Sequence, residues 1–155
     1  MTRPILLTML MAMLTLPVAS RAEQAPPPEY DEALARSFGA DEHGMRSYVL
    51  VILKTGLNRV PDGPEREEMF RGHFANMQRL SDEGKLALAG PLDGVDGWRG
   101  LFVLAVSDLE EAKKLAATDP VIIKGEMVAE YHKYYGSAAL MMVRDGHKRV
   151  AKKSM

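Results

Sequence analysis

The sequence predicts an α+β domain whose elements follow the order strand, helix, strand, strand, helix, strand. Three observations support this prediction. Residues 48–53 are an unbroken apolar run, which is typical of a buried strand. Residues 65–83 place apolar side chains at helical spacing, and Ser107 with Glu110 forms the capping pattern of a second helix. Short apolar runs bounded by glycine or proline supply the remaining strands.

The first strand and the first helix open the domain. A cluster of turn residues at 61–64 separates the strand at 48–53 from the helix at 65–83. One stripe of this helix is apolar with His73 at its centre, and its apolar members are Met69, Phe70, Met77 and Leu80. Gly84 suits the left-handed conformation that closes a helix.

Two strands and the second helix come next. Residues 86–89 form a short strand, and the Asp-Gly pairs within 93–97 predict a hairpin connection to a strand at 100–106. Ser107 is expected to cap the second helix, with Glu110 three residues later as its capping-box partner.

The second helix is expected to run to about Thr118, because Pro120 disfavours helical geometry at the residue before it. A fourth strand covers 127–135. With right-handed crossovers, this order gives a ferredoxin-like βαββαβ fold, a four-stranded antiparallel sheet with two helices on one face. The other sheet face stays uncovered and is substantially apolar, so we expect a homodimer through that face.

The N-terminus has the features of an export signal. A basic start, an apolar run and small residues predict a cleaved signal peptide over residues 1–22, with cleavage after Ser20 as the alternative. The apolar run is too short for a membrane-spanning helix. We therefore expect a secreted or periplasmic protein with no stable membrane anchor after cleavage.

The segments on either side of the folded domain differ in composition from it. Residues 23–45 are expected to be a proline-rich flexible lead-in, with one or two helical turns at 32–38. The domain itself is expected over 46–136, followed by a basic tail over 137–155. We expect this tail to be solvated and frayed, and contact with an anionic membrane surface or partner is the alternative.

Composition excludes several classes of function. The chain has 155 residues, no cysteine and a formal net charge of -1. Disulfides, thiolate metal sites and a cysteine nucleophile are therefore excluded, and no nucleic acid partner is expected. The histidines lack metal-ligand spacing, so we expect neither a metal site nor a cofactor.

His73 and Asp119 are the candidate catalytic residues. Both predicted helices lie on the same sheet face, and Asp119 stands where the second helix ends, so its carboxylate could reach the imidazole. Such a pair fixes the imidazole tautomer and raises its basicity, which suits acid–base catalysis near neutral pH. Each residue also has a structural interpretation. His73 could be a core histidine bonded to a carbonyl, and Asp119 could be a turn residue that ends the helix.

From Arg66 to Tyr135 the sequence resembles the YCII-related domain family. The matching pieces are Arg66 seven residues before His73, Asp82-Glu83-Gly84-Lys85-Leu86, Ala89-Gly90-Pro91, Ser107 to Ala112, and Asp119-Pro120 with Gly125. The resemblance implies a dimeric ferredoxin-like fold with a His–Asp dyad at His73 and Asp119, and Arg66 matches a basic position often seen in the family. One characterised branch removes chloride from a chlorinated ring-cleavage product. The family pattern does not include the signal, the lead-in or the tail. It also commonly has an aromatic residue at the position of Val121.

Together these inferences predict an exported homodimer whose cofactor-free His73–Asp119 site acts on a small organic molecule as a lyase or isomerase. Arg66 and Tyr131 are the candidate substrate-binding residues, although core and dimer packing is the preferred role of the tyrosines near the end of the last strand. One rival is a non-catalytic ligand-binding or structural dimer, in which the His–Asp pair only ties the two helices together. A further rival, haem or aromatic-compound oxygenation on the related dimeric barrel fold, needs a pocket ligand that the sequence does not show.

Overall fold

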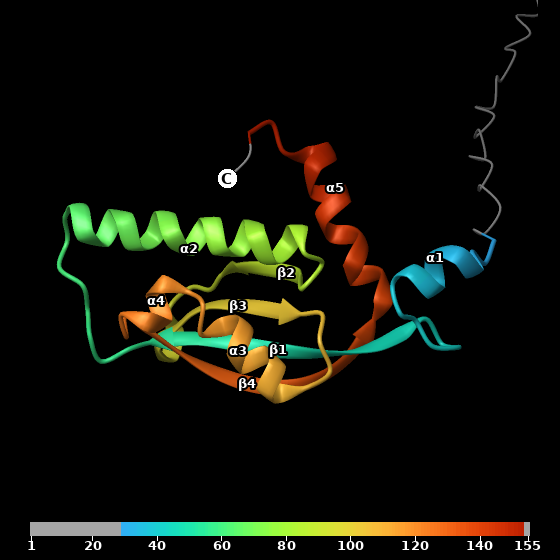
Figure 1. The fold of residues 1–155 in the computed structure, drawn as a ribbon, viewed down its shortest axis with the longest axis horizontal. Helices are drawn as coiled ribbons and strands as arrows, with labels where there is room; N and C mark the ends of the chain where they lie inside the picture. Colours follow the sequence, from blue (N-terminus) through green and yellow to red (C-terminus); the bar gives the residue numbers. More distant parts are fainter. Residues whose placement is uncertain (1–28, 154–155) are drawn as a thin grey trace, which may run out of the picture. The chain divides into compact units, whose positions relative to one another are not determined.

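A computed structural model of the protein describes residues 29–153 (Figure 1). Contacts within the chain define a compact unit that begins at Asp31. The predicted signal peptide and the proline-rich start of the lead-in lie outside the described residues. Among the helices of the described part, none combines the length and the apolar character that crossing a membrane requires.

Four strands form one antiparallel sheet in the order β2-β3-β1-β4. The strands are β1 (Met45–Thr55), β2 (Leu86–Pro91), β3 (Trp98–Leu104) and β4 (Met127–Ser137). β1 lies inside the sheet, because β3 pairs with one of its edges and β4 with the other. An internal strand that is covered on both faces is typically apolar on both faces, as the sequence of β1 is. The predicted α+β class and the four-stranded antiparallel sheet are confirmed.

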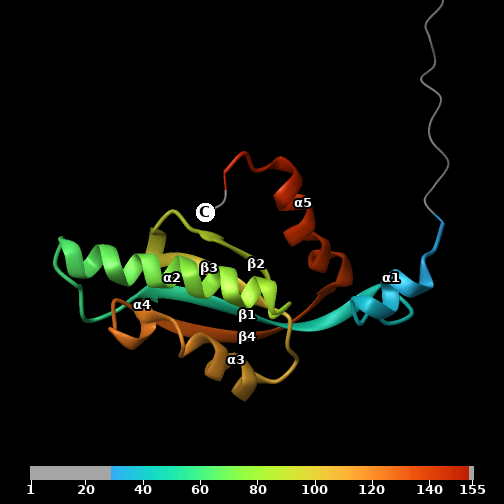
Figure 2. The ribbon, with the colours of Figure 1, turned by 45° about the horizontal axis from the view of Figure 1, so that its top comes forward.

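The helices include the two predicted ones and three others. They are α1 (Glu32–Ser37), α2 (Pro64–Asp82), α3 (Leu109–Ala116), α4 (Pro120–Ile123) and α5 (Val143–Val150), with 3-10 turns η1 (Val95–Gly97) and η2 (Ala138–Met142). Figures 1 and 2 show α2, α3 and α4 on one side of the sheet. Gly84 has a φ of 68° directly after α2, as the sequence predicts for a left-handed helix end.

The main core lies between the sheet and these three helices. Alternate residues of β1 point into it, and Phe102 and Leu104 of β3 lie beside them in the antiparallel register. The helices contribute the buried side chains Met69, Leu80, Ala112 and Val121. This apolar layer holds α2 and α4 on the same sheet face, which is the placement that the candidate site requires.

The C-terminal segment covers one end of the opposite sheet face. A second buried cluster there consists of Tyr48, Ala87 and Val103, and Leu140 and Met141 pack against it. The expectation of a frayed tail is therefore wrong for the described residues up to Val150, because apolar residues at its start anchor η2 and α5 to the sheet. Arg144 also donates hydrogen bonds to the carbonyls of Ser81 and Asp82, at 3.3 and 3.4 Å.

The lead-in is attached to the sheet as well. The turns expected at 32–38 form α1, and the Arg46 guanidinium donates to the carbonyls of Phe38 at 2.7 Å and Ala105 at 3.0 Å. β1 begins at Met45, earlier than the predicted strand. Arg46 therefore joins α1 to the end of β3.

Asp108, and not Ser107, caps α3. The backbone of Asp108 is extended, and its carboxylate accepts a hydrogen bond from the N–H of Glu111 at 2.8 Å. Both residues are followed by a glutamate three positions later, so the capping-box pattern fits either one. The predicted cap is thus wrong by one residue. A carboxylate is favoured there because it also meets the positive end of the helix dipole.

We expect Asp108→Ala to lower the free energy of unfolding by about 0.5–2 kcal/mol, because it removes the side-chain acceptor of the cap. Ser107→Ala is the matched control and should change the free energy by less than about 0.5 kcal/mol. Urea unfolding of the two variants measures both values. A larger loss in Ser107→Ala than in Asp108→Ala would contradict the assigned cap.

Candidate active site

The structure brings His73 and Asp119 into direct contact. The Nδ1 atom of His73 lies 2.9 Å from Oδ1 and 2.8 Å from Oδ2 of Asp119. The Asp119 side chain is fully buried and the His73 side chain is 10% exposed. A carboxylate can only accept, so the proton of this hydrogen bond is on Nδ1.

The N-terminus of α4 and one glycine of α2 make this contact possible. Asp119 is the N-cap of α4, and its Oδ1 accepts from the N–H of Val121 at 3.1 Å. Gly72 lies directly beside Pro120, since a Cβ on Gly72 would come within 2.9 Å of the proline Cγ. The helix α2 can therefore approach α4 closely only because residue 72 has no side chain. This glycine was not recognised from the sequence, although a glycine in a helix interior is itself a signal of close packing.

Aromatic rings surround the imidazole. Phe102 of β3 stacks with it at 6.0 Å between ring centroids, and Phe70 and Phe74 of α2 lie at 6.2 and 5.3 Å. Within the described residues Nε2 makes no hydrogen bond, and it retains accessible surface. His73 is therefore held through Nδ1 and the ring faces, while Nε2 has no hydrogen-bond partner in the described part of the chain.

A second polar contact, one turn further along α2, joins this helix to the residue before Asp119. Asn76 is buried, and its Oδ1 accepts from Arg79 at 2.7 Å and from the Thr118 hydroxyl at 3.0 Å. Thr118 directly precedes Asp119, so this bond restrains the backbone that carries the carboxylate. The Asn76 side chain occupies the stripe that the sequence predicts to be apolar, and its polar role was not recognised.

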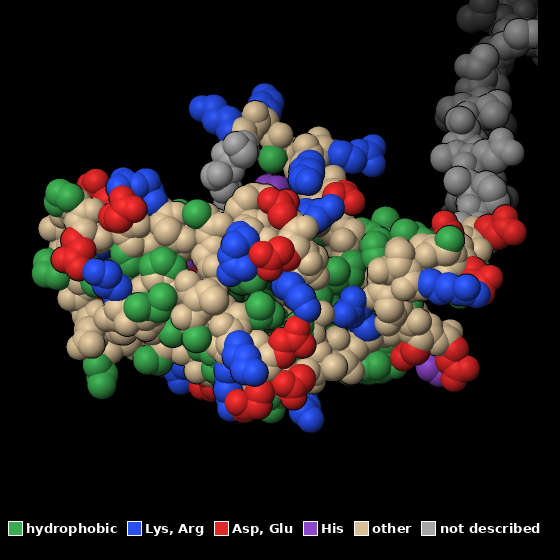
Figure 3. Space-filling model, viewed as in Figure 1, with side chains coloured by type: hydrophobic (Ala, Val, Ile, Leu, Met, Phe, Trp, Pro, Cys, Tyr) green, Lys and Arg blue, Asp and Glu red, His purple; other side chains and the backbone are tan. Residues whose placement is uncertain are grey.

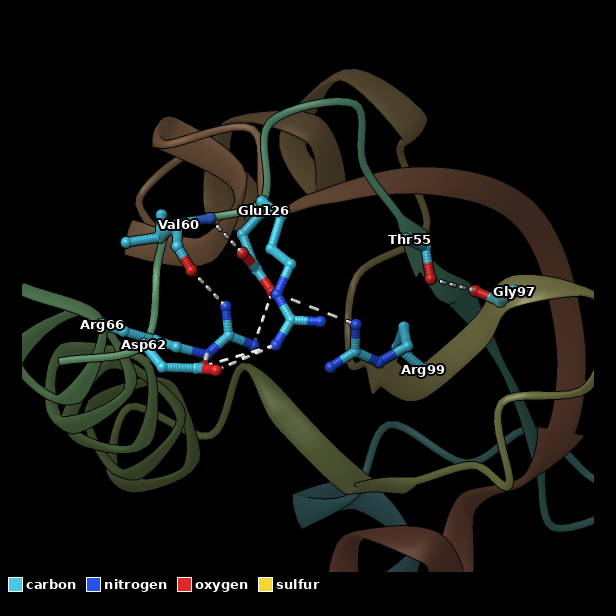
Figure 4. Close-up of polar contacts among 8 residues, drawn as sticks. Thr55, Val60, Asp62, Arg66, Gly97, Arg99 and Glu126 are labelled. Atoms are coloured by element: carbon cyan, nitrogen blue, oxygen red, sulfur yellow. Dashed lines mark hydrogen bonds and ion pairs between the residues drawn. The ribbon is translucent and has the colours of Figure 1, made fainter.

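Arg66 takes part in a separate buried cluster, shown in Figure 4. Its Nη2 lies 2.8 Å from Oε1 of Glu126, which is 2% exposed, and its Nη1 donates to the Val60 carbonyl at 2.8 Å. The other carboxylate oxygen of Glu126 accepts from the Val60 N–H at 2.8 Å. Arg99 points toward the same carboxylate from β3, at 4.0 Å. Glu126 was not recognised from the sequence, because it belongs to no motif.

Electrostatics keep the Glu126 carboxylate charged. Burial raises its pKa, but the hydrogen bonds from Arg66 and Val60 and the charges of Arg66 and Arg99 outweigh this effect, and the pKa lies below its usual value. The hydrogen bond to Glu126 in turn raises the pKa of Arg66. Because protein groups accept the Arg66 hydrogen bonds, the geometry favours a role for Arg66 in holding the loop before α2.

Tyr131 lies under α3 and not at the His–Asp pair. It pairs with Val51 across the β1–β4 ladder and packs at the edge of the main core. Burial raises its pKa, and the nearby charge of Lys113 lowers it by less. In the described part of the chain, no hydrogen bond or ring contact joins Tyr131 to His73 or Asp119. Substrate binding by Arg66 and Tyr131 stays a prediction.

A cavity of about 460 Å³ lies between α2, β2 and α5. Phe74, whose ring contacts His73, forms part of its wall, but neither His73 nor Asp119 lines it. Among residues 29–153, no group of three His, Asp or Glu side chains is placed to share a metal ion. The arrangement can therefore supply a histidine base with a buried carboxylate partner, next to a cavity that the base does not line.

We expect Gly72→Ala to destabilise the fold by about 1–3 kcal/mol, because the new methyl group overlaps the rigid Pro120 ring and forces α2 and α4 apart. Gly146→Ala in α5 is the matched control, since its Cβ would meet nothing within 4 Å. There alanine should stabilise by up to about 1 kcal/mol. Thermal unfolding of both variants measures the difference. Equal stabilisation by both substitutions would contradict the close approach at Gly72.

Comparison with known proteins places the domain in a family. A family model described as the YCII-related domain matches residues 47–132, more than half of the chain. The uncharacterized protein YjpA of Bacillus subtilis (strain 168) is 32% identical over 59 residues, which cover 38% of this chain and 67% of that protein. The residues of the family match include His73, Asp119, Arg66 and Glu126. The chain belongs to the YCII-related domain family.

Proposed function

We propose that this protein uses His73 as a general acid–base on a small organic molecule, as a cofactor-free lyase or isomerase. The observation that supports the proposal most strongly is the orientation of the imidazole. Nδ1 donates to a fully buried carboxylate while Nε2 is left without a partner in the described part. A histidine held in this way presents one basic nitrogen of known tautomer to a reactant.

The reaction that suits this geometry begins with transfer of a carbon-bound proton to Nε2. The electron pair of the broken C–H bond then either moves toward a neighbouring electron-withdrawing group or expels a leaving group from the adjacent carbon. The imidazolium that forms carries its positive charge beside Asp119, which stabilises it. In an isomerase the imidazolium returns the proton to another carbon, whereas in a lyase the proton is released after the leaving group departs.

The surrounding rings support this chemistry. Phe70, Phe74 and Phe102 limit the access of water to the imidazole, and an ion pair between the imidazolium and Asp119 is stronger where water is excluded. Phe74 is 49% exposed, so it is the ring of the three that a small rotation could move. Its displacement would connect the cavity of about 460 Å³ with the imidazole.

One observation favours a second candidate function, a non-catalytic ligand-binding or structural dimer. The cavity is not lined by either member of the pair, and Asp119 has a structural role as the N-cap of α4. In this alternative the hydrogen bond only ties α2 to α4. The two functions differ in what happens to a reactant when His73 is replaced.

We expect His73→Asn to reduce turnover at least about 100-fold, since a positioned acid–base group contributes about 10²–10⁴-fold. Turnover is measured as the uptake of deuterium from D2O, or the loss of a leaving group, in a pool of small carbon acids. Loss of the hydrogen bond also costs about 1–3 kcal/mol, so the assay must run well below the melting temperature of the variant.

His43→Asn is the matched control, because the His43 side chain is 75% exposed and belongs to the turn before β1. It should leave turnover unchanged. Addition of free imidazole to His73→Ala should restore part of the turnover if His73 moves the proton. Conversion that persists in His73→Asn, or a wild-type protein that converts no compound of the pool, would favour the structural alternative.

We also propose that the protein is exported and forms a homodimer through the sheet face opposite α2. This face presents Leu50, Leu101, Val128 and Tyr134, and the last two are 48% and 40% exposed. Apolar side chains that alternate on the outer face of a sheet commonly pack against a second sheet. Export rests on the sequence of residues 1–22.

We expect a dimer mass in light scattering at micromolar concentration, and a monomer mass for Val128→Glu, which places a charge in the proposed interface. Ile123→Glu is the matched control, because Ile123 is 67% exposed on α4 at the other side of the sheet. It should remain dimeric. A monomeric wild-type protein, or a dimer that survives Val128→Glu, would contradict an interface on this face.

A further inference from the structure

The C-terminal helix, which lies outside the residues of the family match, forms one wall of a groove. α5 begins at Val143, after the matched range of 47–132, and it lies beside β2 and the end of α2. The cavity of about 460 Å³ lies between these three elements. This volume falls within the range of about 300–1,000 Å³ that is typical of small-molecule sites.

The floor of the groove is apolar and open to solvent. Met77 and Leu86 lie at its base, and three large side chains of the wall remain exposed, namely Phe74 at 49%, Leu88 at 36% and Val143 at 36%. These three side chains come from α2, β2 and α5, which surround the groove, so the exposed apolar surface is concave. Such a surface gains free energy when an apolar ligand displaces water from it.

The rim of the groove on the α5 side is basic. The lining includes Arg144, His147, Lys148, Lys152 and Lys153, and it includes no Asp or Glu. Figure 3 shows Lys and Arg side chains gathered over α5. Within residues 29–153, neither Lys148 nor Lys152 has a carboxylate oxygen within 4.0 Å. These two lysines therefore carry charges that the described part of the chain does not neutralise.

Arg144 holds the basic rim in position. Its guanidinium donates to the carbonyls of Ser81 and Asp82 at the end of α2, so α5 is anchored at its first turn. Val143, His147 and Ala151 then recur at helical spacing along the side that faces the groove, with Lys148 and Lys152 next to them. The groove thus combines an apolar floor with a positive rim, without requiring a rearrangement of the chain.

We propose that this groove binds a small organic anion with an apolar body, such as a carboxylate attached to a hydrocarbon chain. The apolar part would lie against Phe74, Met77 and Leu88, and the carboxylate would lie at Lys148 and Lys152. Charge complementarity selects an anion, the absence of acidic lining residues disfavours a cation, and the volume of about 460 Å³ suits a small molecule. The proposal concerns binding, and it holds whether or not His73 is catalytic.

Calorimetric titration of the full chain with three ligands of equal chain length tests the chemistry of the site. Decanoate should bind with one site per chain, decanol should bind about tenfold more weakly, and decyltrimethylammonium should not bind detectably. Equal binding of the anion and the cation would show simple apolar adsorption and would overturn the proposal. Failure of decanoate to bind would overturn it as well.

Variants locate the site. Lys148→Gln combined with Lys152→Gln should weaken decanoate about tenfold and leave decanol unchanged. The matched control combines Lys114→Gln with Lys133→Gln, which removes the same charge from exposed positions on α3 and β4 and should have no effect. Equal weakening by both pairs would overturn the proposal, because it would show a general effect of net charge.

Ala151→Phe places a large ring in the groove and should abolish binding of decanoate and decanol together. Retention of binding in this variant would place the ligand elsewhere and contradict the assignment. If Ala151→Phe instead lowers the oligomeric mass of the protein, a second copy of the chain occupies the groove and the proposal fails. Unfolding curves of every variant, compared with wild type, ensure that binding is measured on folded protein.

Discussion

The hydrogen bond between His73 and Asp119 is the interaction on which the arrangement of the helices depends. It joins α2, from the first half of the βαββαβ order, to the N-terminus of α4, from the second half. The Asp119 side chain is fully buried and that of His73 is 10% exposed, so the carboxylate cannot exchange this partner for solvent without cost. The bond therefore restrains the position of α4 on α2, and the same restraint leaves Nε2 as the free nitrogen of the imidazole.

Other contacts reinforce this restraint from both ends of the site. Thr118 donates to Asn76 on one side of the pair, and Gly72 allows Pro120 to lie against α2. At the beginning of α2, the Arg66–Glu126 cluster ties the loop before the helix to the residue before β4. These contacts share one consequence, since each connects α2 to the segment between α3 and β4 and limits sliding between them.

Much of the fold follows from patterns that are local in the sequence. Apolar runs predict the strands, and turn residues predict the loops between elements. Gly84 predicts the end of the first helix, because glycine favours the left-handed backbone conformation found there. The predicted cap of α3 differs by one residue from the observed one, because Ser107 and Asp108 are each followed by a glutamate three positions later. The helical tail was not predicted, because α5 has an exposed, basic surface and is held by η2 and by Arg144, contacts that no local pattern reveals.

The candidate site likewise contains residues that the sequence predicts and residues that it does not. His73 and Asp119 were paired from helix placement and family resemblance, and the structure shows them within hydrogen-bond distance. Gly125 belongs to the Asp119-Pro120 motif of the family resemblance, and the structure gives a physical reason for a glycine at this position. Its φ is 72°, and a Cβ there would come within 2.9 Å of Asn58. Glu126 and Asn76 could not be predicted, because their importance comes from burial beside partners distant in sequence.

We propose that Asp119 holds the His73 imidazole with its proton on Nδ1 and leaves Nε2 free as the base. The most direct measurement is nitrogen-15 NMR of the His73 ring in its neutral form, in wild type and in Asp119→Asn. Wild type should show a protonated Nδ1 and an unprotonated Nε2, and the variant should show an altered Nδ1 resonance. A proton on Nε2, or an Nδ1 resonance that Asp119→Asn leaves unchanged, would contradict it.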